Sequence, residues 1–244
     1  MRLVLRFVTW NCNGALRKKF SMLQSMQADV FIIQECEDPS HVQCSSYHDW
    51  ARNYLWVGPN KNRGLGIFAR SGVTLEASPL DLGALELFLP CRVNDSINLV
   101  GVWSRQANSP TFKYIGQVWK FLQKNSCFLE SGNSILIGDF NSNSCWDVWD
   151  RWWNHSDVVR HLSLIGLESA YHVLRNEVQG GEQEPTFFMY RKPNKPYHID
   201  YAFISNSLLD GASCEVGRPD DWLAASDHMP VLVEIPERNE IPPV

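Results

Sequence analysis

The chain has 244 residues, of which 44% are hydrophobic, and its 27 acidic and 22 basic side chains give a formal net charge of -5. No run of about 18 apolar residues occurs, so the sequence predicts no membrane span. Seven cysteines without a CxxC pair argue against a disulfide scaffold or structural zinc site and favour a cytoplasmic protein with reduced thiols. The mild acidity disfavours tight, sequence-independent binding of duplex nucleic acid, which usually needs a basic face.

The first half of the chain alternates short apolar runs with polar turns. The opening residues are too few and too charged for a secretory signal, so we expect them to form a strand. A helix is predicted next because Leu16, Phe20 and Leu23 recur near helical period. In chain order, the predicted elements are strand 2–9, helix 15–27 and strands 30–34, 54–57 and 66–69.

The second half repeats this mixture of strands and helices. Ser109 and Pro110 mark a helix start, and Ser156 or Asp157 is expected to cap another helix that Gly166 ends. In chain order, the predicted elements are strands 87–93 and 97–103, helix 111–124, strand 134–137, helix 157–165 and strands 199–205 and 229–235.

The domain organisation follows from what the sequence lacks. No repeat, low-complexity tract or linker divides the chain, so residues 1–236 are predicted to form one domain, with a loosely held tail at 237–244. Strands alternate with helices in places and follow one another directly elsewhere. This pattern favours an α/β fold with two packed sheets and helices outside over a doubly wound parallel sheet.

The most informative segment is the apolar run that ends in Gly138, Asp139, Phe140 and Asn141. A buried strand that stops here places Asp139 and Asn141 at the rim of a sheet, and side chains two apart share a face. Four further polar groups also end strand-like stretches: residues 10–14, 33–35, 198–201 and 226–230. Carboxylates, amides and one histidine placed in this way are the components of a divalent-metal phosphoester hydrolase.

The candidate metal ligands are oxygen donors. Mg²⁺ prefers such ligands and usually keeps several waters, so one or two carboxylates suffice. Glu35 and Asp227 are the first candidates, and Asn11 and Asn13 could add an amide oxygen or hold a ligand in place. Taken alone, Glu35 could equally be a surface acid before a loop.

The candidate catalytic groups are Asp139, Asn141, Asp200 and His228. Hydrolysis needs an activated water and positive charge on the non-bridging phosphate oxygens. Asp139 could accept the proton of the water, while Asn141 orients the water or the phosphate. His228 could bind the phosphate as a cation if Asp200 partners its other ring nitrogen.

Together these segments resemble the endonuclease/exonuclease/phosphatase superfamily, in which exonuclease III and deoxyribonuclease I are found. The resemblance runs from Trp10 to Pro230, with five blocks in the family order, and Gly-Asp-Phe-Asn with Ser-Asp-His-Met-Pro is specific in combination. It implies a four-layer α/β sandwich, two packed mixed β-sheets flanked by helices, with Mg²⁺ or Mn²⁺ as the cofactor.

The resemblance also implies roles by position. Asn11 resembles the asparagine that supports the metal and phosphate, Glu35 the principal metal-binding glutamate, and Asp227 the second metal-associated acid. Asp139 and Asn141 resemble the water-activating pair. Asp200 and His228 resemble the acid and the phosphate-binding histidine that pair with each other.

Two positions depart from the family pattern. Many relatives carry tyrosine or histidine where strand 97–103 ends, and here Trp103 is followed by Ser104 and Arg105. Tryptophan can donate one hydrogen bond but cannot act as an acid, so Ser104, Arg105 or another group could take that role. Asn13 stands where some relatives have aspartate.

Several side chains are predicted to face the substrate. Arg63 lies in a basic loop that could approach a phosphate backbone or could be a solvated turn, and Arg191 lies in a second basic patch with the same two interpretations. The full predicted set is Asn13, Arg63, Trp103, Asn143, His155 and Arg191.

Residues 145–155 contain Trp146, Trp149, Trp152 and Trp153. The first three fall three apart and could share a helical face. We favour a helix that docks this face on the core, since apolar stripes are usually buried. A stacking wall for bases is the alternative.

The sequence therefore predicts an enzyme that hydrolyses phosphodiester bonds of nucleic acid, DNA or RNA. A phosphatase or phosphodiesterase for a small or lipid-linked phosphoester is the alternative, favoured by the acidic balance. A non-catalytic binding scaffold is disfavoured because every expected catalytic residue is present.

Overall fold

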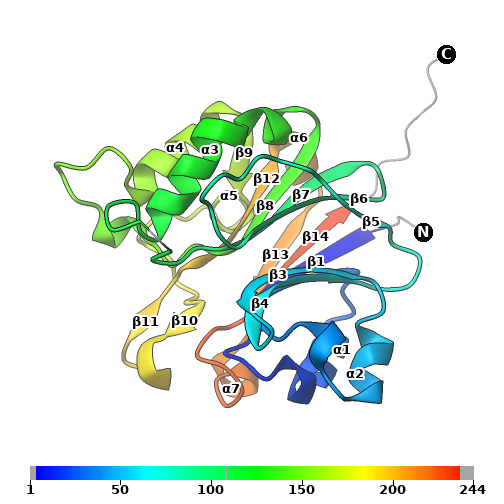
Figure 1. Ribbon diagram of the computed structural model, residues 1–244. Coiled ribbons are helices and arrows are strands. Elements are labelled where there is room, and N and C mark those ends of the chain that lie inside the picture. Colours follow the sequence, from blue (N-terminus) through cyan, green and yellow to red (C-terminus); the bar gives the residue numbers. More distant parts are fainter. Residues whose placement is uncertain (1–3, 108, 237–244) are drawn as a thin grey trace.

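The computed structural model describes residues 4–107 and 109–236, and the tail predicted at 237–244 lies outside them. Two six-stranded mixed sheets pack face to face, and helices cover both outer faces (Figure 1). The predicted α/β sandwich is confirmed. Among the described residues, none of the helices has the length and apolar character that crossing a lipid bilayer requires.

The first sheet is built mainly from the N-terminal half of the chain. Strand β1 pairs in parallel with β2 and antiparallel with β14. The strand order is β13 (Ser213–Val216), β14 (Val231–Pro236), β1 (Val4–Asn11), β2 (Val30–Cys36), β4 (Arg63–Ala69) and β3 (Tyr54–Asn60).

The second sheet comes from the middle of the chain. Strand β7 pairs in parallel with β8, and β12 runs antiparallel to β8 on the other side. The strand order is β5 (Leu75–Ala77), β6 (Phe88–Val93), β7 (Ile97–Trp103), β8 (Asn133–Asp139), β12 (Asp200–Ser205) and β9 (Leu167–Ser169). A separate hairpin joins β10 (Phe187–Phe188) to β11 (Pro196–Tyr197).

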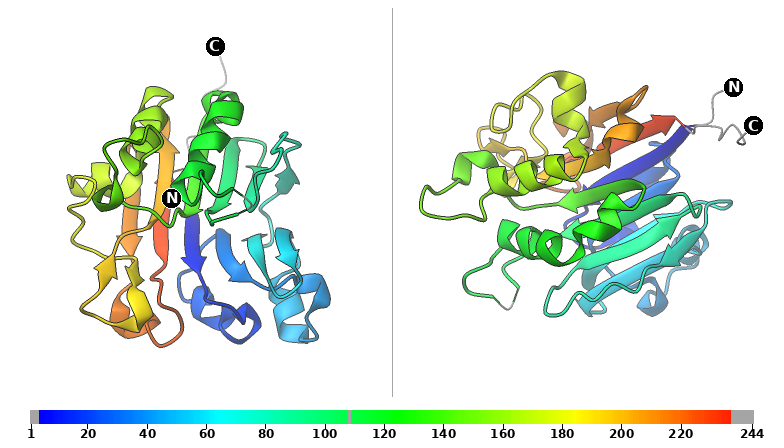
Figure 2. Two further views of the ribbon diagram at one scale, coloured as in Figure 1. Left: turned by 60° about the vertical axis from the view of Figure 1, so that its left-hand side comes forward. Right: turned by 90° about the horizontal axis from the view of Figure 1, so that it is seen from above.

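Three apolar clusters hold the layers together. Side chains of Phe7, Ile32, Leu99 and Ile137 are buried between the two sheets. The helices beneath the first sheet are α1 (Phe20–Gln24), α2 (Ser45–Trp50) and α7 (Pro219–Trp222). The helices on the second sheet are α3 (Ile115–Glu130) and α4 (His155–Leu164), which Figure 2 shows from above.

The remaining elements are short. Helices α5 (Ala170–Arg175) and α6 (Asn206–Leu209) flank the strands β9 and β12. Single 3₁₀ turns occupy η1 (Leu16–Lys18), η2 (Pro39–His41), η3 (Ser144–Trp146) and η4 (Met189–Arg191).

Helix boundaries differ from the sequence-based prediction in three places. The helix expected at 15–27 breaks into η1 and α1, with Ala15 left-handed at φ 53°. Helix α3 begins only at Ile115, because Tyr114 before it has a φ of 49°. Helix α4 begins at His155 rather than 157, since Asp157 accepts a hydrogen bond from the backbone N–H of Asn154.

The favoured interpretation of the tryptophan-rich segment is wrong. Residues after η3 form turns rather than a helix, and the Trp149 side chain is 96% exposed. The side chain of Asn154 closes this loop, because its amide bonds the N–H and C=O of Val148. The loop backbone therefore satisfies its polar groups locally, and Trp146, Trp149 and Trp152 are exposed instead of docked on the core.

Candidate active site

Asp139 lies at the end of β8, fully buried between the sheets. Its Oδ1 accepts a hydrogen bond from the backbone N–H of Asn141 at 2.8 Å. Its Oδ2 accepts from the side-chain amides of Asn141 and Asn11, both at 3.0 Å. The carboxylate is therefore held rigidly by donors from both sheets.

Gly138 allows the strand to end in this way. Its φ is +150°, and a Cβ atom here would lie 1.9 Å from the carbonyl oxygen of Val102 on β7. Only glycine permits this close approach of two backbones, so the residue before the acid is fixed by packing.

Asp200 and His228 form a buried pair next to Asp139. Asp200 lies opposite Asp139 in the antiparallel pairing of β12 with β8. The Nδ1 atom of His228 lies 2.9 Å from Oδ2 of Asp200. Because a carboxylate only accepts, the ring donates from Nδ1, which leaves Nε2 directed elsewhere.

Burial and neighbouring charges shift the pKa values of Asp139 and His228. Burial and the charge of Asp200 raise the pKa of Asp139 to about 7. Burial alone would lower the pKa of His228, but the negative charges of Asp200 and Asp139 outweigh it and raise the pKa to about 9. At neutral pH the ring is therefore a buried cation, kept charged by the two neighbouring carboxyl groups, and its Nε2–H remains free to donate to an anion.

Glu35 reaches the same region from the first sheet. A bulge interrupts the pairing of β2 with β4 between Gln34 and Cys36, and Glu35 within it has a φ of 62°. A bulge of this kind redirects a side chain out of the regular alternation. The Oε1 of Glu35 lies 3.4 Å from the amide nitrogen of Asn11, and its Oε2 pairs with Arg63 at 2.5 Å.

Asn11, Asn13 and Asp227 connect the acids to one another. The amide nitrogen of Asn11 donates to both Glu35 and Asp139, while its oxygen accepts from the backbone N–H of Asn13 at 3.1 Å. The Asn13 side chain donates to Asp227 at 3.0 Å. Of the two roles open to Asn11, this geometry favours holding ligands in place over ligation.

The donor set suits a hard divalent cation. Asp139, Asp200 and His228 offer ligand atoms within 4.8 Å of one another, but a protonated histidine has no lone pair for a metal. The carboxylates of Glu35, which accepts from the Asn11 amide, and of Asp227, which accepts from the Asn13 amide, are oxygen donors of the kind that Mg²⁺ prefers.

Trp103 ends β7 in register with Asp139. Its side chain is 3% exposed, so it has little surface for direct contact with a substrate. The guanidinium groups of Arg63 and Arg105 lie over its ring, at 5.6 and 4.9 Å from the ring centroid. The arginines that cover the ring are more exposed than the tryptophan itself.

Asn143 and His155 belong to a separate buried polar cluster. The Asn143 amide nitrogen bonds Glu182, the carbonyl oxygen of His198 and the hydroxyl of Tyr201. His155 is 1% exposed and pairs with Gln179, so it has little surface for the predicted contact with a substrate.

Arg191 uses its guanidinium to brace a loop. It donates to the carbonyl oxygens of Ala224 and Ala225, just before Asp227. Its expected contact with a phosphate therefore competes with these two hydrogen bonds.

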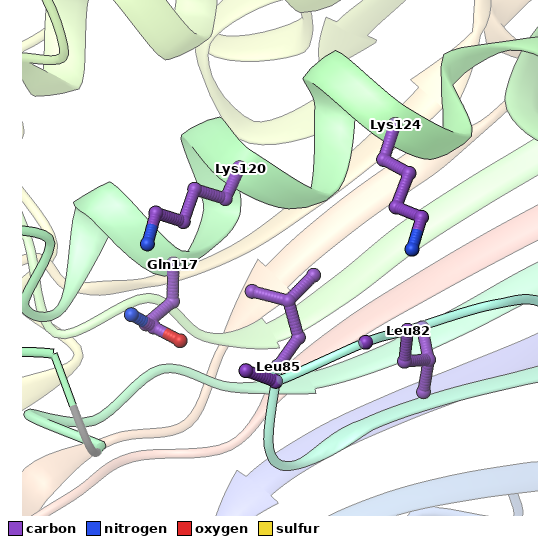
Figure 3. A pocket seen from close by; sticks show the side chains of 7 residues that line it. Leu82, Leu85, Gln117, Lys120 and Lys124 are labelled. Atoms are coloured by element: carbon purple, nitrogen blue, oxygen red, sulfur yellow. The ribbon is translucent and has the colours of Figure 1, made fainter.

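Two hollows lie outside the group formed by Asp139, Asp200 and His228. One of about 450 Å³ lies beside the β10–β11 hairpin, and Asn143, Glu182, Tyr197 and His198 contribute to its wall. The other, of about 290 Å³, lies between residues 82–85 and helix α3 (Figure 3). None of the acids or the histidine described above lines this second hollow, where Lys124 pairs with Asp81.

Sequence reasoning did not identify three supporting residues. The Thr186 hydroxyl accepts from the backbone N–H of Asp200 at 3.0 Å. The Ser226 hydroxyl accepts from the N–H of His228 and donates to the carbonyl oxygen of Asn11. The Trp10 indole donates to the carbonyl oxygen of His228. Trp10 and Ser226 lie within the polar segments 10–14 and 226–230, whereas no signal in the sequence pointed to Thr186.

Comparison with known families identifies the class. The model of the Endonuclease/Exonuclease/phosphatase family matches residues 8–228, and the chain belongs to this family. The protein is therefore an enzyme of the phosphoester hydrolase class. No curated protein sequence matches the chain significantly.

Solved structures share the fold at low sequence identity. A 3'-5' exonuclease from Neisseria meningitidis, NExo, is 20% identical with a TM-score of 0.71, and the match covers 96% of this chain and 100% of that one. An AP endonuclease from Archaeoglobus fulgidus is 17% identical with a TM-score of 0.66, covering 94% and 98%. A further structure, of a variant described as the 3' phosphatase NExo from Neisseria bound to a product DNA hairpin, has 20% identity, a TM-score of 0.70 and coverage of 96% and 100%.

Proposed function

We propose that the protein is a divalent-metal-dependent nuclease that hydrolyses phosphodiester bonds of DNA or RNA with an activated water. The observation that carries this proposal is the buried group of Asp139, Asp200 and His228, with Glu35 beside it. The DNA-acting descriptions of the structural neighbours support nucleic acid as the substrate class. The cysteine pattern supports a cytoplasmic location.

In the proposed mechanism, Asp139 accepts the proton of the attacking water and Asn141 keeps its carboxylate in position. A group that takes this proton works best with a pKa near the working pH, and the raised pKa of Asp139 meets that requirement. His228 donates from Nε2 to a non-bridging phosphate oxygen, while Asp200 fixes the ring through Nδ1.

Glu35 and Asp227 are the proposed metal-binding acids, with Asn11 and Asn13 holding them in place. When bound, Mg²⁺ or Mn²⁺ would supply positive charge that stabilises the developing charge on the phosphate. The substrate-facing groups proposed from the structure are Arg63 and Arg105, together with Asn13 at the exposed edge.

A small phosphoester remains the second candidate substrate. The net charge of -5 favours it, because long contacts with a phosphate backbone usually need a basic surface. A neighbour described as a 3' phosphatase also supports removal of a terminal phosphate.

A panel assay tests both candidates. Purified protein with Mg²⁺ or Mn²⁺ is offered single-stranded and duplex DNA, DNA with an abasic site or a 3' phosphate, RNA, nucleotides and inositol phosphates, with Asp139→Ala as the blank. We expect the wild type to cleave at least one of the nucleic acids and Asp139→Ala to cleave none of them. Turnover of small phosphoesters alone would favour the second candidate, and no turnover of any substrate would overturn the enzymatic proposal.

A further inference from the structure

The segment after β7 is bound directly to the catalytic strand end. The backbone N–H of Ser104 donates to the carbonyl oxygen of Asp139 at 2.8 Å, and the Asn141 amide donates to the carbonyl oxygen of Ser104 at 2.9 Å. Arg105 therefore leaves the sheet at a position fixed relative to Asp139 and Asn141. Its own carbonyl oxygen accepts from the N–H of Tyr114, which holds the segment on its far side.

The Arg105 side chain is partly buried and lies over the Trp103 ring. Arg63, over the same ring, is neutralised by Glu35. In the described part of the chain, Arg105 has no carboxylate within ion-pair distance. A guanidinium that stacks on an aromatic ring keeps its N–H donors free at its edge, where they match a phosphate.

The negative charges around the site would make an additional cation favourable for binding a phosphate. Four acids, Glu35, Asp139, Asp200 and Asp227, meet in this region, and a phosphate that enters must overcome their repulsion. His228 and the proposed divalent cation offset part of that charge. A further cation held at a fixed place beside Asp139 lowers the cost of bringing in the anion.

We propose that Arg105, seated on Trp103, binds a non-bridging oxygen of a substrate phosphate and so supplies at the end of β7 a contact that tryptophan cannot make. The proposal rests on the phosphoester hydrolysis proposed above. Two sources offer the same ligand chemistry: the scissile phosphate itself, or a neighbouring phosphate of a nucleic-acid strand.

The test compares Arg105→Gln with Arg105→Lys and with Arg92→Gln. Arg92 is an exposed arginine on β6 that pairs with Asn98, at the opposite end of β7 from Trp103. Each variant is assayed on bis(4-nitrophenyl) phosphate, which has one phosphate, and on a single-stranded oligonucleotide. Binding of the oligonucleotide is measured by fluorescence anisotropy at several salt concentrations, without metal to prevent cleavage.

We expect Arg105→Gln to lower kcat/KM by about 10- to 100-fold, the usual effect of losing a charge-assisted contact, with Arg105→Lys in between and Arg92→Gln unchanged. A loss on both substrates assigns the contact to the scissile phosphate. A loss on the oligonucleotide alone, with a salt slope reduced by about one, assigns it to a neighbouring phosphate.

Turnover within threefold of the wild type on both substrates, with an unchanged salt slope, would overturn the role of Arg105. A wild-type protein that cleaves neither substrate would instead count against the proposed function. The salt slope of binding would still decide whether Arg105 contacts phosphate, so the two failures are distinguishable.

Discussion

The protonation states of Asp139 and His228 should make the activity depend on pH. The proposed mechanism needs Asp139 as a carboxylate and His228 as a cation. Since the pKa of Asp139 is raised to about 7 and that of His228 to about 9, both forms coexist mainly between these values. The pKa of Asp139 is raised by burial and by the charge of Asp200, whereas the pKa of His228 is raised by the charges of Asp200 and Asp139 against the effect of burial.

We therefore expect kcat/KM to rise as pH increases toward about 7 and to fall above about 9. A bound divalent cation would favour the carboxylate form, so the acidic limb should move to lower pH as Mg²⁺ increases. Rates measured from pH 5 to 10 at low and high Mg²⁺ check this. A profile that rises steadily through pH 10 would contradict the role of protonated His228.

Burying Asp139 should also cost stability. Between pH values of about 4 and 7 the unfolded chain ionises this group while the folded protein keeps it protonated, so folding is progressively disfavoured as pH rises through this window. Asp139→Asn removes this cost and should raise Tm by at least about 2–4 °C at pH 8, equivalent to about 1 kcal/mol.

Thermal unfolding of the wild type and Asp139→Asn at pH 4 and pH 8 measures this effect. The advantage of the variant should be larger at pH 8 than at pH 4. An equal or lower Tm at pH 8 would show that hydrogen bonds from Asn11 and Asn141 outweigh the cost of burying the charge.

At the scale of elements, the end of β8 depends on Gly138. Gly132, just before the same strand, has nearly the same φ, +149° against +150°. A Cβ atom added at Gly132 would meet no atom within 4 Å, whereas one added at Gly138 would meet the Val102 carbonyl. Substitutions at these two glycines therefore distinguish the effect of backbone strain, which both share, from that of the steric clash with Val102, which occurs only at Gly138.

Gly132→Ala should destabilise the protein by about 1–3 kcal/mol through backbone strain alone. Gly138→Ala should cost at least about 1–3 kcal/mol more, because β7 and β8 must move apart. Urea unfolding of both variants provides the comparison. Equal losses would mean that the close approach to Val102 does not matter for stability.

The elements also show why some predictions succeeded and others failed. The apolar run before Gly138 fixes β8 because a strand that is buried on both faces must be continuously apolar. The spacing of Trp146, Trp149 and Trp152 indicated a helix, but Asn154 satisfies the loop backbone instead. The periodicity of apolar residues does not reveal hydrogen bonds that a polar side chain makes to the backbone.

At the scale of the whole molecule, the site exists only where the two sheets meet. Asn11 and Glu35 come from the first sheet, Asp139 and Asp200 from the second, and His228 from the segment before β14. The family resemblance predicted this sandwich, and the match over residues 8–228 confirms the family.

Sequence alone could not supply the contacts that complete the site. The bulge that turns Glu35, the Thr186 hydroxyl under Asp200 and the arginines over Trp103 all depend on residues brought together by folding. Each arises between segments with no local pattern that links them.

The most direct test of the account is the turnover of Asp139→Asn, His228→Asn and the double variant, measured with Mg²⁺ on the best substrate. We expect each single variant to lose at least about 100-fold, and the double variant to be within about tenfold of the worse single one, because the two residues act as a unit. A folded single variant with turnover within tenfold of the wild type would contradict the central claim.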